Sequence, residues 1–315
     1  MNRWRGMSMK QENALNNILE ADFKLNERPN HEPLRVLSEE DWKFWKENGY
    51  VVVPNAVPQE NLDRLVNLIW EFEEKDPNDS STWYKPARRE IQMKELVNTG
   101  MVELYNHQYL WDNRMNERVY QAFVDIWGTE RLWVSIDRCN LNLPIRPGYE
   151  YKGFIHWDVN TSLDPLPVNV QGILTLADTD IDMGGFQCIP ELYRNFHEWV
   201  KTQPADRDPY KPDTTGFTPT KVVAKAGDLI IFHSMLAHGI RANHSAKPRL
   251  AQYISMFPAQ EYNEELRQSR IESWRDRIPP KGMAFPGDPR NWEQTKYERA
   301  NLTELGEKLL GLKNW

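Results

Sequence analysis

Five stretches of the chain have the composition of β-strands. Two of them, residues 132–143 and 168–176, alternate their side chains between two faces with the two-residue period of a strand. The other three are rich in apolar or β-branched residues and begin next to a glycine or a proline. They are residues 50–53, 227–239 and 249–255. This pattern predicts a mainly β protein.

Helical signals flank these strands. Ser38 and Asp41 have the spacing of a capping box, and Gly49 supplies the left-handed C-cap of the helix that they begin. Residues 302–309 carry leucines at helical spacing and are followed by Gly311. A further predicted helix has one apolar stripe, formed by Leu62, Leu65, Val66 and Ile69. We therefore expect helices packed around a sheet.

One face of the strand predicted at 132–143 is unusually polar. Arg138, Asn140 and Asn142 alternate on it, and buried polar groups need hydrogen-bond partners. Either this face is exposed to solvent or it lines a polar pocket. We favour the pocket, because the strand directly precedes a segment that carries candidate metal ligands.

Composition and charge narrow the class of protein. The 315 residues are 40% hydrophobic and carry a formal net charge of −7, which gives no electrostatic basis for nucleic-acid binding. Two cysteines exclude a disulfide framework. The first residues lack the apolar core of a signal peptide, and no apolar run has the length of a membrane span. We expect a cytoplasmic protein that binds a small-molecule substrate, without a membrane or nucleic-acid partner; a homodimer is left open.

The candidate chemistry begins at His156 and Asp158. Side chains two residues apart on an extended strand leave the same face, so an imidazole and a carboxylate converge there. His238 ends the apolar strand far downstream, and Arg249 follows it by eleven positions. Two histidines and one carboxylate form the facial triad that holds non-haem Fe(II) and leaves its other coordination positions open. His233, five residues before His238, is predicted to point to the opposite face and to be structural, and the remaining histidines have no metal-ligand spacing.

These motifs resemble the phytanoyl-CoA dioxygenase family of Fe(II)/2-oxoglutarate-dependent oxygenases. The resemblance covers roughly residues 36–260, and the chain departs from the family at 190–193, where small turn residues are usual. It implies a double-stranded β-helix, a jelly-roll core like that of the cupins. It also implies Fe(II), 2-oxoglutarate and O2, with release of succinate and CO2. A carboxylate at Asp158, where halogenating relatives have a small residue, favours hydroxylation or another oxidation.

The resemblance also implies roles for single residues. His156, Asp158 and His238 would be the metal ligands and catalytic centre, and Arg249 would bind the distal carboxylate of 2-oxoglutarate, because its planar guanidinium fits a carboxylate better than a lysine does. Gln171 and Asn142 are predicted to approach this cosubstrate. The predicted substrate contacts are Arg138, Asn140, Trp157 and Arg88.

The domain organisation is predicted in three parts. Residues 1–35 form a flexible arm, 36–260 the oxygenase domain with its N-terminal helices, and 261–315 a helical extension that packs on the core. The substrate stays open among a secondary metabolite, an amino-acid derivative, a sugar and an acyl compound. Two alternatives use no oxo acid: a cupin-like metal-binding isomerase and a non-catalytic binding protein.

Overall fold

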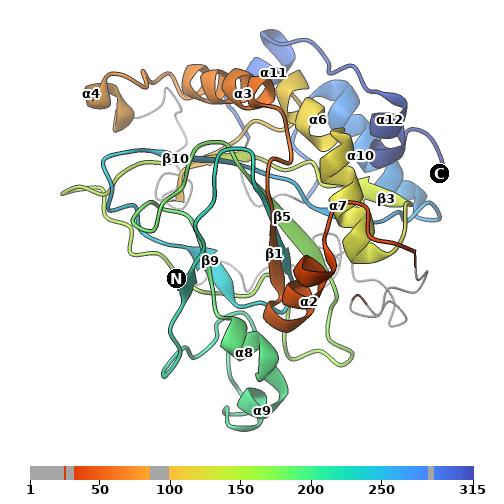
Figure 1. The fold of residues 1–315 in the computed structure, drawn as a ribbon. Helices are drawn as coiled ribbons and strands as arrows, with labels where there is room; N and C mark the ends of the chain where they lie inside the picture. Colours follow the sequence, from red (N-terminus) through yellow and green to blue (C-terminus); the bar gives the residue numbers. More distant parts are fainter. Residues whose placement is uncertain (1–24, 26–31, 86–98, 283–286) are drawn as a thin grey trace.

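The computed structural model describes Leu25 and residues 32–85, 99–282 and 287–315. Its described strands pair antiparallel and form a six-stranded, a three-stranded and a two-stranded sheet (Figure 1). The six-stranded sheet has, in spatial order, β1 (Tyr50–Val53), β8 (Leu229–His233), β5 (Val170–Thr175), β10 (Arg249–Tyr253), β4 (Cys139–Asn142) and β2 (Met101–Val102). The three-stranded sheet has β7 (Thr220–Lys221), β6 (Phe186–Cys188) and β9 (His238–Ile240), and the third pairs β11 (Met256–Pro258) with β3 (Leu132–Val134). The predicted sheets with flanking helices are present and antiparallel, but the helices hold more of the described residues than the strands do, so the chain is mixed α/β rather than mainly β.

Helices gather on one side of the six-stranded sheet, and two short ones lie at the other end of the molecule (Figure 1). The first group includes α3 (Gln59–Phe72), α6 (Gln108–Arg114), α7 (Glu117–Trp127), α10 (Glu264–Asp276), α11 (Trp292–Thr295) and α12 (Glu304–Leu310). The second pair is α8 (Pro190–Arg194) and α9 (Phe196–Lys201). Helix α2 (Glu39–Asn48) precedes β1, and helix α4 (Ser80–Trp83) follows α3.

The two faces of the six-stranded sheet have different partners. Residues such as Leu174, Ile231 and Leu250 point outward into the large core that the helices cover. Residues on the alternate positions, such as Ile173 and Phe232, share a second core with Phe186 of β6. The six-stranded and three-stranded sheets therefore pack face to face, and the space between them is the inner face that positions the site.

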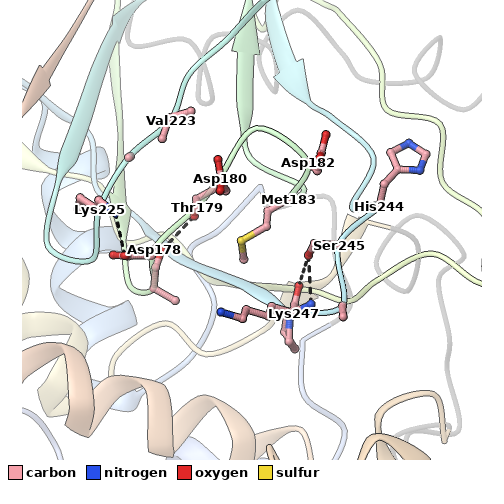
Figure 2. Close-up of a pocket in the computed structure, with 14 residues that line it drawn as sticks. Asp178, Thr179, Asp180, Asp182, Met183, Val223, Lys225, His244, Ser245 and Lys247 are labelled. Carbon is pink, nitrogen blue, oxygen red and sulfur yellow. Dashed lines mark hydrogen bonds and ion pairs between the residues drawn. The ribbon is translucent and has the colours of Figure 1, made fainter.

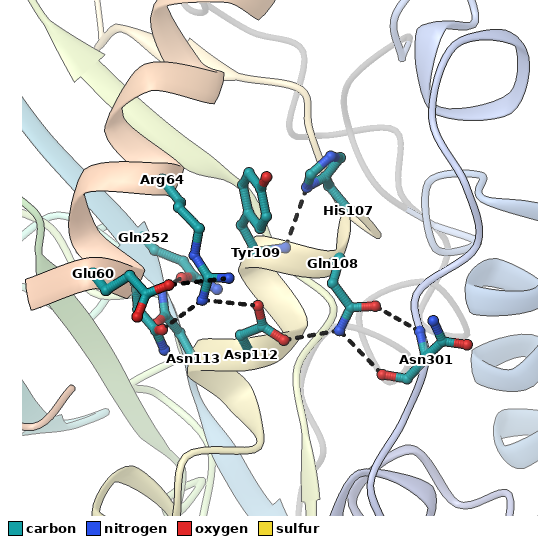
Figure 3. Close-up of polar contacts among 10 residues, drawn as sticks. Glu60, Arg64, His107, Gln108, Tyr109, Asp112, Asn113, Gln252 and Asn301 are labelled. Carbon is teal, nitrogen blue, oxygen red and sulfur yellow. Dashed lines mark hydrogen bonds and ion pairs between the residues drawn. The ribbon is translucent and has the colours of Figure 1, made fainter. Parts of the chain in front are cut away.

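Helix α6 fixes the outer face of β10 through buried polar contacts (Figure 3). The Asn113 Nδ2 donates to the Gln252 Oε1 at 2.9 Å, and the Gln252 Nε2 donates to the carbonyl of Leu110 at 3.0 Å. Gln252 is fully buried, so these bonds replace those that its amide would make with water. They hold β10 against the helices and leave its opposite face to the interior.

Two stretches that the alternation predicts as single strands are each divided between two sheets. Residues 132–143 break after Val134, so β3 pairs with β11 while β4 joins the six-stranded sheet. Residues 227–239 break at 234–237, so β8 and β9 belong to sheets that face each other. The prediction of continuous strands was wrong in both places. The turn at 234–237 keeps much of the apolar composition of the strands beside it, whereas residues 135–138 are polar apart from Ile136.

The predicted helices are present, but Val66 of the predicted buried stripe is only half-buried and Leu302 lies before its helix. Ser38 and Asp41 form the reciprocal bonds of a capping box, and Gly49 is left-handed with φ of 73°. In α3, Leu62, Leu65 and Ile69 are buried. Helix α12 begins at Glu304, after Leu302, and ends at a left-handed Gly311.

The division into three parts stays a prediction, although the described residues show how the ends are attached. Leu25 is buried in the large core, and the Arg35 backbone N–H donates to the Asp125 Oδ1 at 2.8 Å. Leu309 and Leu310 of α12 belong to the same core. Most of the predicted arm lies outside the described residues, and so do residues 86–98, which include Arg88.

Glu293 ties the C-terminal segment to the loop before α6. Its buried carboxylate accepts the backbone N–H groups of Tyr105, at 2.8 Å, and Asn106, at 2.5 Å. Burial raises the pKa of Glu293 from 4.5 to about 7, although these bonds oppose the shift.

We predict that stability falls as pH rises through this carboxyl's titration. The folded chain holds the proton more tightly than the unfolded chain between about pH 4.5 and pH 7, so ionisation costs about 3 kcal/mol across that window. In urea unfolding at pH 5, 6 and 7, Glu293→Gln should flatten this decline. Glu304→Gln, at an exposed position, is the control. An equal decline of the unfolding free energy with pH in Glu293→Gln and in the native chain would contradict the assignment of this pH dependence to Glu293.

Candidate metal centre

The site is built on a backbone exchange between His156 and His238. The N–H of His156 donates to the carbonyl of His238 at 2.8 Å, and the N–H of His238 donates back at 3.0 Å. This antiparallel bridge places two distant histidines opposite each other, with ring centroids 4.7 Å apart. His156 lies outside the named strands, and Asp158 lies in a bend rather than on an extended strand.

Two glycines allow the two segments to come this close. A Cβ on Gly239 would overlap the carbonyl oxygen of Phe154, and a Cβ on Gly153 would lie 2.8 Å from the carbonyl oxygen of Ile240. Gly153 also has φ of 77°, a conformation that favours glycine. The glycines beside the histidines are therefore part of the site.

The carboxylate of Asp158 lies between the two imidazoles. Its Oδ1 is 2.9 Å from the His156 Nε2, and its Oδ2 is 3.3 Å from the His238 Nε2. The three potential ligand atoms all lie within 4.8 Å of one another, and no other group of His, Cys, Asp and Glu in the described part of the chain could hold a metal ion. The predicted convergence of these residues is therefore observed.

Surrounding groups orient these ligands. The Gln171 Nε2 donates to the Asp158 Oδ2 at 2.8 Å, and the His238 Nδ1 lies 2.8 Å from the carbonyl of Leu236. A proton on that Nδ1 leaves the Nε2 lone pair free to bind a metal. Phe232 packs against the His238 ring at 4.5 Å between centroids. Strand alternation from Ile230 would have predicted this inward position of Phe232, which our sequence analysis missed.

The electrostatics of the triad favour a charged carboxylate. Burial opposes ionisation of Asp158, but its interactions with His156 and His238 outweigh this effect and hold its pKa well below the ordinary value. Burial likewise opposes protonation of His156, but Asp158 raises the net pKa of its imidazole. The side chain of Asp158 is 45% exposed and that of His238 only 7%, so the centre opens to solvent on the carboxylate side.

Arg249 lies deep on the inner sheet face. It is 2% exposed, and its Nη1 donates to the Asn140 Oδ1 at 2.8 Å. Arg249 pairs with Asn142 across β10 and β4, so both asparagines share its face. Asn140 and Asn142 are buried, which excludes the solvent-exposed alternative for this polar face.

The structure places the other predicted contacts as follows. Arg138 is 9% exposed, and its Nε donates to the neighbouring Asp137 at 3.1 Å. Trp157 is 1% exposed and packs edge-on against Trp199 in an aromatic cluster, which fits structural support and gives no support to a substrate contact. Arg88 lies outside the described residues. The predicted cosubstrate contacts of Gln171 and Asn142 stay predictions.

His233 occupies a structural position, as predicted, but for a different reason. His233 ends β8, while His238 begins β9 in the facing sheet. The two residues are not on one strand, so the argument from their odd separation does not hold. The His233 Nδ1 accepts the N–H of Met235 at 3.0 Å, and its ring lies beside Trp45. Burial lowers its pKa to about 4, which keeps it neutral.

A separate cavity of about 680 Å³ lies at the end of β5 opposite to Gln171 (Figure 2). It is lined by Asp178, Asp182, Lys225 and Lys247, among others, and Lys225 pairs with Asp178 at 3.1 Å. The aspartates of the turn at 178–182 therefore lie beside lysines, and this turn contains no group of metal ligands.

Comparison with known proteins agrees with this geometry. The sequence profile of the phytanoyl-CoA dioxygenase (PhyH) family matches residues 45–251. The chain belongs to this family. The match includes the triad and Arg249, and it extends from α2 to β10.

Individual relatives of this PhyH-family chain are distant. A Dictyostelium discoideum protein that carries the phytanoyl-CoA dioxygenase name is 22% identical over 275 residues, which cover 73% of this chain and 78% of that protein. The crystal structure of GIG2 from Candida albicans aligns with a TM-score of 0.65 and 11% identity over 98% of this chain and 90% of its own. The epimerase SnoN aligns with a TM-score of 0.51 and 15% identity over 70% and 83%. These likenesses show a shared fold.

One further property follows from the helices. In the residues that the structure describes, none of them is both long and apolar enough to cross a membrane.

We predict that Gly239→Ala weakens metal binding roughly five- to 150-fold. The added methyl group must displace the Phe154 backbone, and overpacking of this kind costs about 1–3 kcal/mol. This displacement would move His156, two residues later, out of its position as a metal ligand. Anaerobic isothermal titration calorimetry with Fe(II) measures the affinity. Gly216→Ala is the control, because its φ of 86° is also unfavourable for alanine but its Cβ meets no atom within 4 Å. Equal affinities in both variants would contradict the packing argument.

Proposed function

We propose that this PhyH-family protein is a non-haem Fe(II)- and 2-oxoglutarate-dependent dioxygenase built on a double-stranded β-helix. The observation that carries the proposal is the position of Arg249. Its guanidinium is buried on the inner face that also holds Gln171, and no described carboxylate forms an ion pair with it. A buried cation without a counter-ion is costly, so this position favours an anionic ligand.

The donor set suits Fe(II). Two imidazole nitrogens and one carboxylate on one side of a metal are the ligands of the facial triad, which leaves positions for a bidentate oxo acid and O2. When bound, iron and 2-oxoglutarate would supply the oxidation of an unactivated C–H bond, with release of succinate and CO2. SnoN, a protein of shared fold, has been solved in complex with Fe3+, alpha-ketoglutarate and nogalamycin RO, which supports the same pair of ligands here.

The protein's own groups would perform distinct tasks. His156, His238 and Asp158 would hold the metal, and the bond between the His238 Nδ1 and Leu236 would keep its Nε2 directed at the metal. Gln171 would hold Asp158 in its orientation. Arg249, itself oriented by Asn140, would bind the distal carboxylate of the oxo acid through its planar fork.

The substrate is proposed to be a small polar molecule, oxidised at the solvent-open side of the triad. Arg138 and Asn140 stay candidates for its recognition on account of their charge and polarity, and Arg88 stays a candidate from the sequence alone. Hydroxylation is the proposed outcome, because Asp158 occupies the third ligand position. A cytoplasmic location and the absence of nucleic-acid and membrane partners belong to the proposal as well, and a homodimer stays open.

We predict that Arg249→Ala raises the Kd for 2-oxoglutarate about 100-fold while Fe(II) affinity stays within about threefold. Each charge-assisted hydrogen bond contributes about 1.5–3 kcal/mol, and none of the metal ligands contacts this side chain in the described structure. Anaerobic titration that follows the visible charge-transfer band of the Fe(II)–oxo-acid complex measures the Kd.

Two further variants control this experiment. Arg249→Lys keeps the buried charge but loses the planar fork, so it should fold and still bind the oxo acid more weakly. Lys247→Ala, two residues earlier and exposed, should leave the Kd unchanged. A native protein that binds Fe(II) but forms no charge-transfer band with 2-oxoglutarate would overturn the proposed function.

A further inference from the structure

Tyr253 lies on the same face of β10 as Arg249. Residues four apart on a strand share a face, and Tyr253 pairs with Ile173, an inward residue of β5. Its hydroxyl is buried and forms no hydrogen bond in the described structure. The hydroxyl faces the Arg249 guanidinium, although the two groups do not meet with hydrogen-bond geometry.

Two more groups near Tyr253 lack partners. The Arg249 Nε is buried without an acceptor, and so is the hydroxyl of Tyr151, which lies close enough to Tyr253 to interact with it electrostatically. An unpartnered buried donor costs about 1–3 kcal/mol, so three together require an explanation. Such groups in a native protein commonly mark a place where a ligand or a water molecule binds.

The chemistry of these groups indicates the ligand's charge. A guanidinium has no acceptor, so it can satisfy neither phenolic proton. Burial raises the pKa of Tyr253, and the nearby Arg249 only partly reverses this shift. Burial likewise raises the pKa of Tyr151. Both phenols therefore stay protonated at neutral pH, and the cluster offers donors to an anion.

We propose that the Tyr253 hydroxyl donates a second hydrogen bond to the carboxylate that Arg249 binds, and so selects dicarboxylic over monocarboxylic oxo acids. The inference rests on the proposed function and deepens it. Tyr151 closes the same site from the loop before His156, with its ring edge-on to Phe154 at 6.2 Å between centroids. Tyr253 is thus a binding residue for the cosubstrate, and a phenylalanine there would keep the packing and lose the bond.

The test compares Tyr253→Phe with Tyr297→Phe. The Tyr297 hydroxyl is also buried without a partner, but its ring packs against His107 at 4.8 Å, on the helical side of the molecule. Each substitution removes one unsatisfied hydroxyl, so neither should lower the Tm of the ligand-free protein. A difference in ligand binding between the two variants then shows that the location of the lost hydroxyl, and not its loss alone, affects binding.

The measurement uses the full chain with Fe(II) under anaerobic conditions and two oxo acids. 2-Oxoglutarate has the distal carboxylate and pyruvate does not, so pyruvate reports binding at the metal alone. In Tyr253→Phe, the Kd for 2-oxoglutarate should rise roughly ten- to 100-fold, because a hydrogen bond to a charged group is lost. The Kd for pyruvate should change less than twofold. Tyr297→Phe should match the native protein with both.

Each outcome decides between explanations. A Kd for 2-oxoglutarate within twofold of native in Tyr253→Phe would overturn the inference and leave the proposed function standing. Equal losses for 2-oxoglutarate and pyruvate would also overturn it, because the residue would then support the whole site. A native protein that binds Fe(II) without discriminating between the two acids would overturn the proposed function together with the inference.

Discussion

The bridge between His156 and His238 is the interaction on which the rest of the site depends. Two backbone hydrogen bonds hold segments from different parts of the chain at the spacing that a metal ion requires. The bridge can form only because Gly239 presents no side chain to the Phe154 carbonyl. Metal-ligand geometry in this protein is therefore a consequence of close backbone packing, and the imidazoles take their positions from it.

The six-stranded sheet separates two kinds of environment. Gln252 and Arg249 lie on the same strand, but one faces the helices and the other the interior. On the helical side both ends of the Gln252 amide have protein partners, whereas the Arg249 Nε and the Tyr253 hydroxyl on the inner face have none in the described structure. The apolar core beneath the helices offsets the cost of this unsatisfied interior, since apolar burial is the main stabilising term in folding.

The sequence predicted the parts that depend on local patterns. The capping box at Ser38, the C-cap at Gly49 and the buried stripe of α3 follow from rules that act within one or two helical turns. The inward face of Asn140 and Asn142 follows from strand alternation. The convergence of His156, Asp158 and His238 was predicted from the spacing of these residues and from the resemblance, and the geometry agrees with it.

What the sequence did not predict depends on contacts between distant segments. The turn at 234–237 moves the chain from one sheet to the facing sheet, but its residues are as apolar as the strands beside it. The aromatic neighbours of Trp157 include Phe196 and Trp199 of α9, about 40 positions away, so proximity along the chain to the triad did not predict this packing. Tyr253 was missed for a related reason: an aromatic residue at a strand end is usually part of the core, and only the structure shows its hydroxyl without a partner.

The same contrast between satisfied and open groups explains how a ligand would act on this fold. Asp158 is already paired with two histidines, so a cation entering there exchanges one set of favourable contacts for another. At the Arg249 end, the Arg249 Nε and the Tyr253 hydroxyl have no partner in the described structure, so an anion that they bind adds contacts there without removing any. The distal carboxylate of an oxo acid would therefore gain hydrogen bonds that the ligand-free protein does not make, while the triad would set the position of the acid's other end.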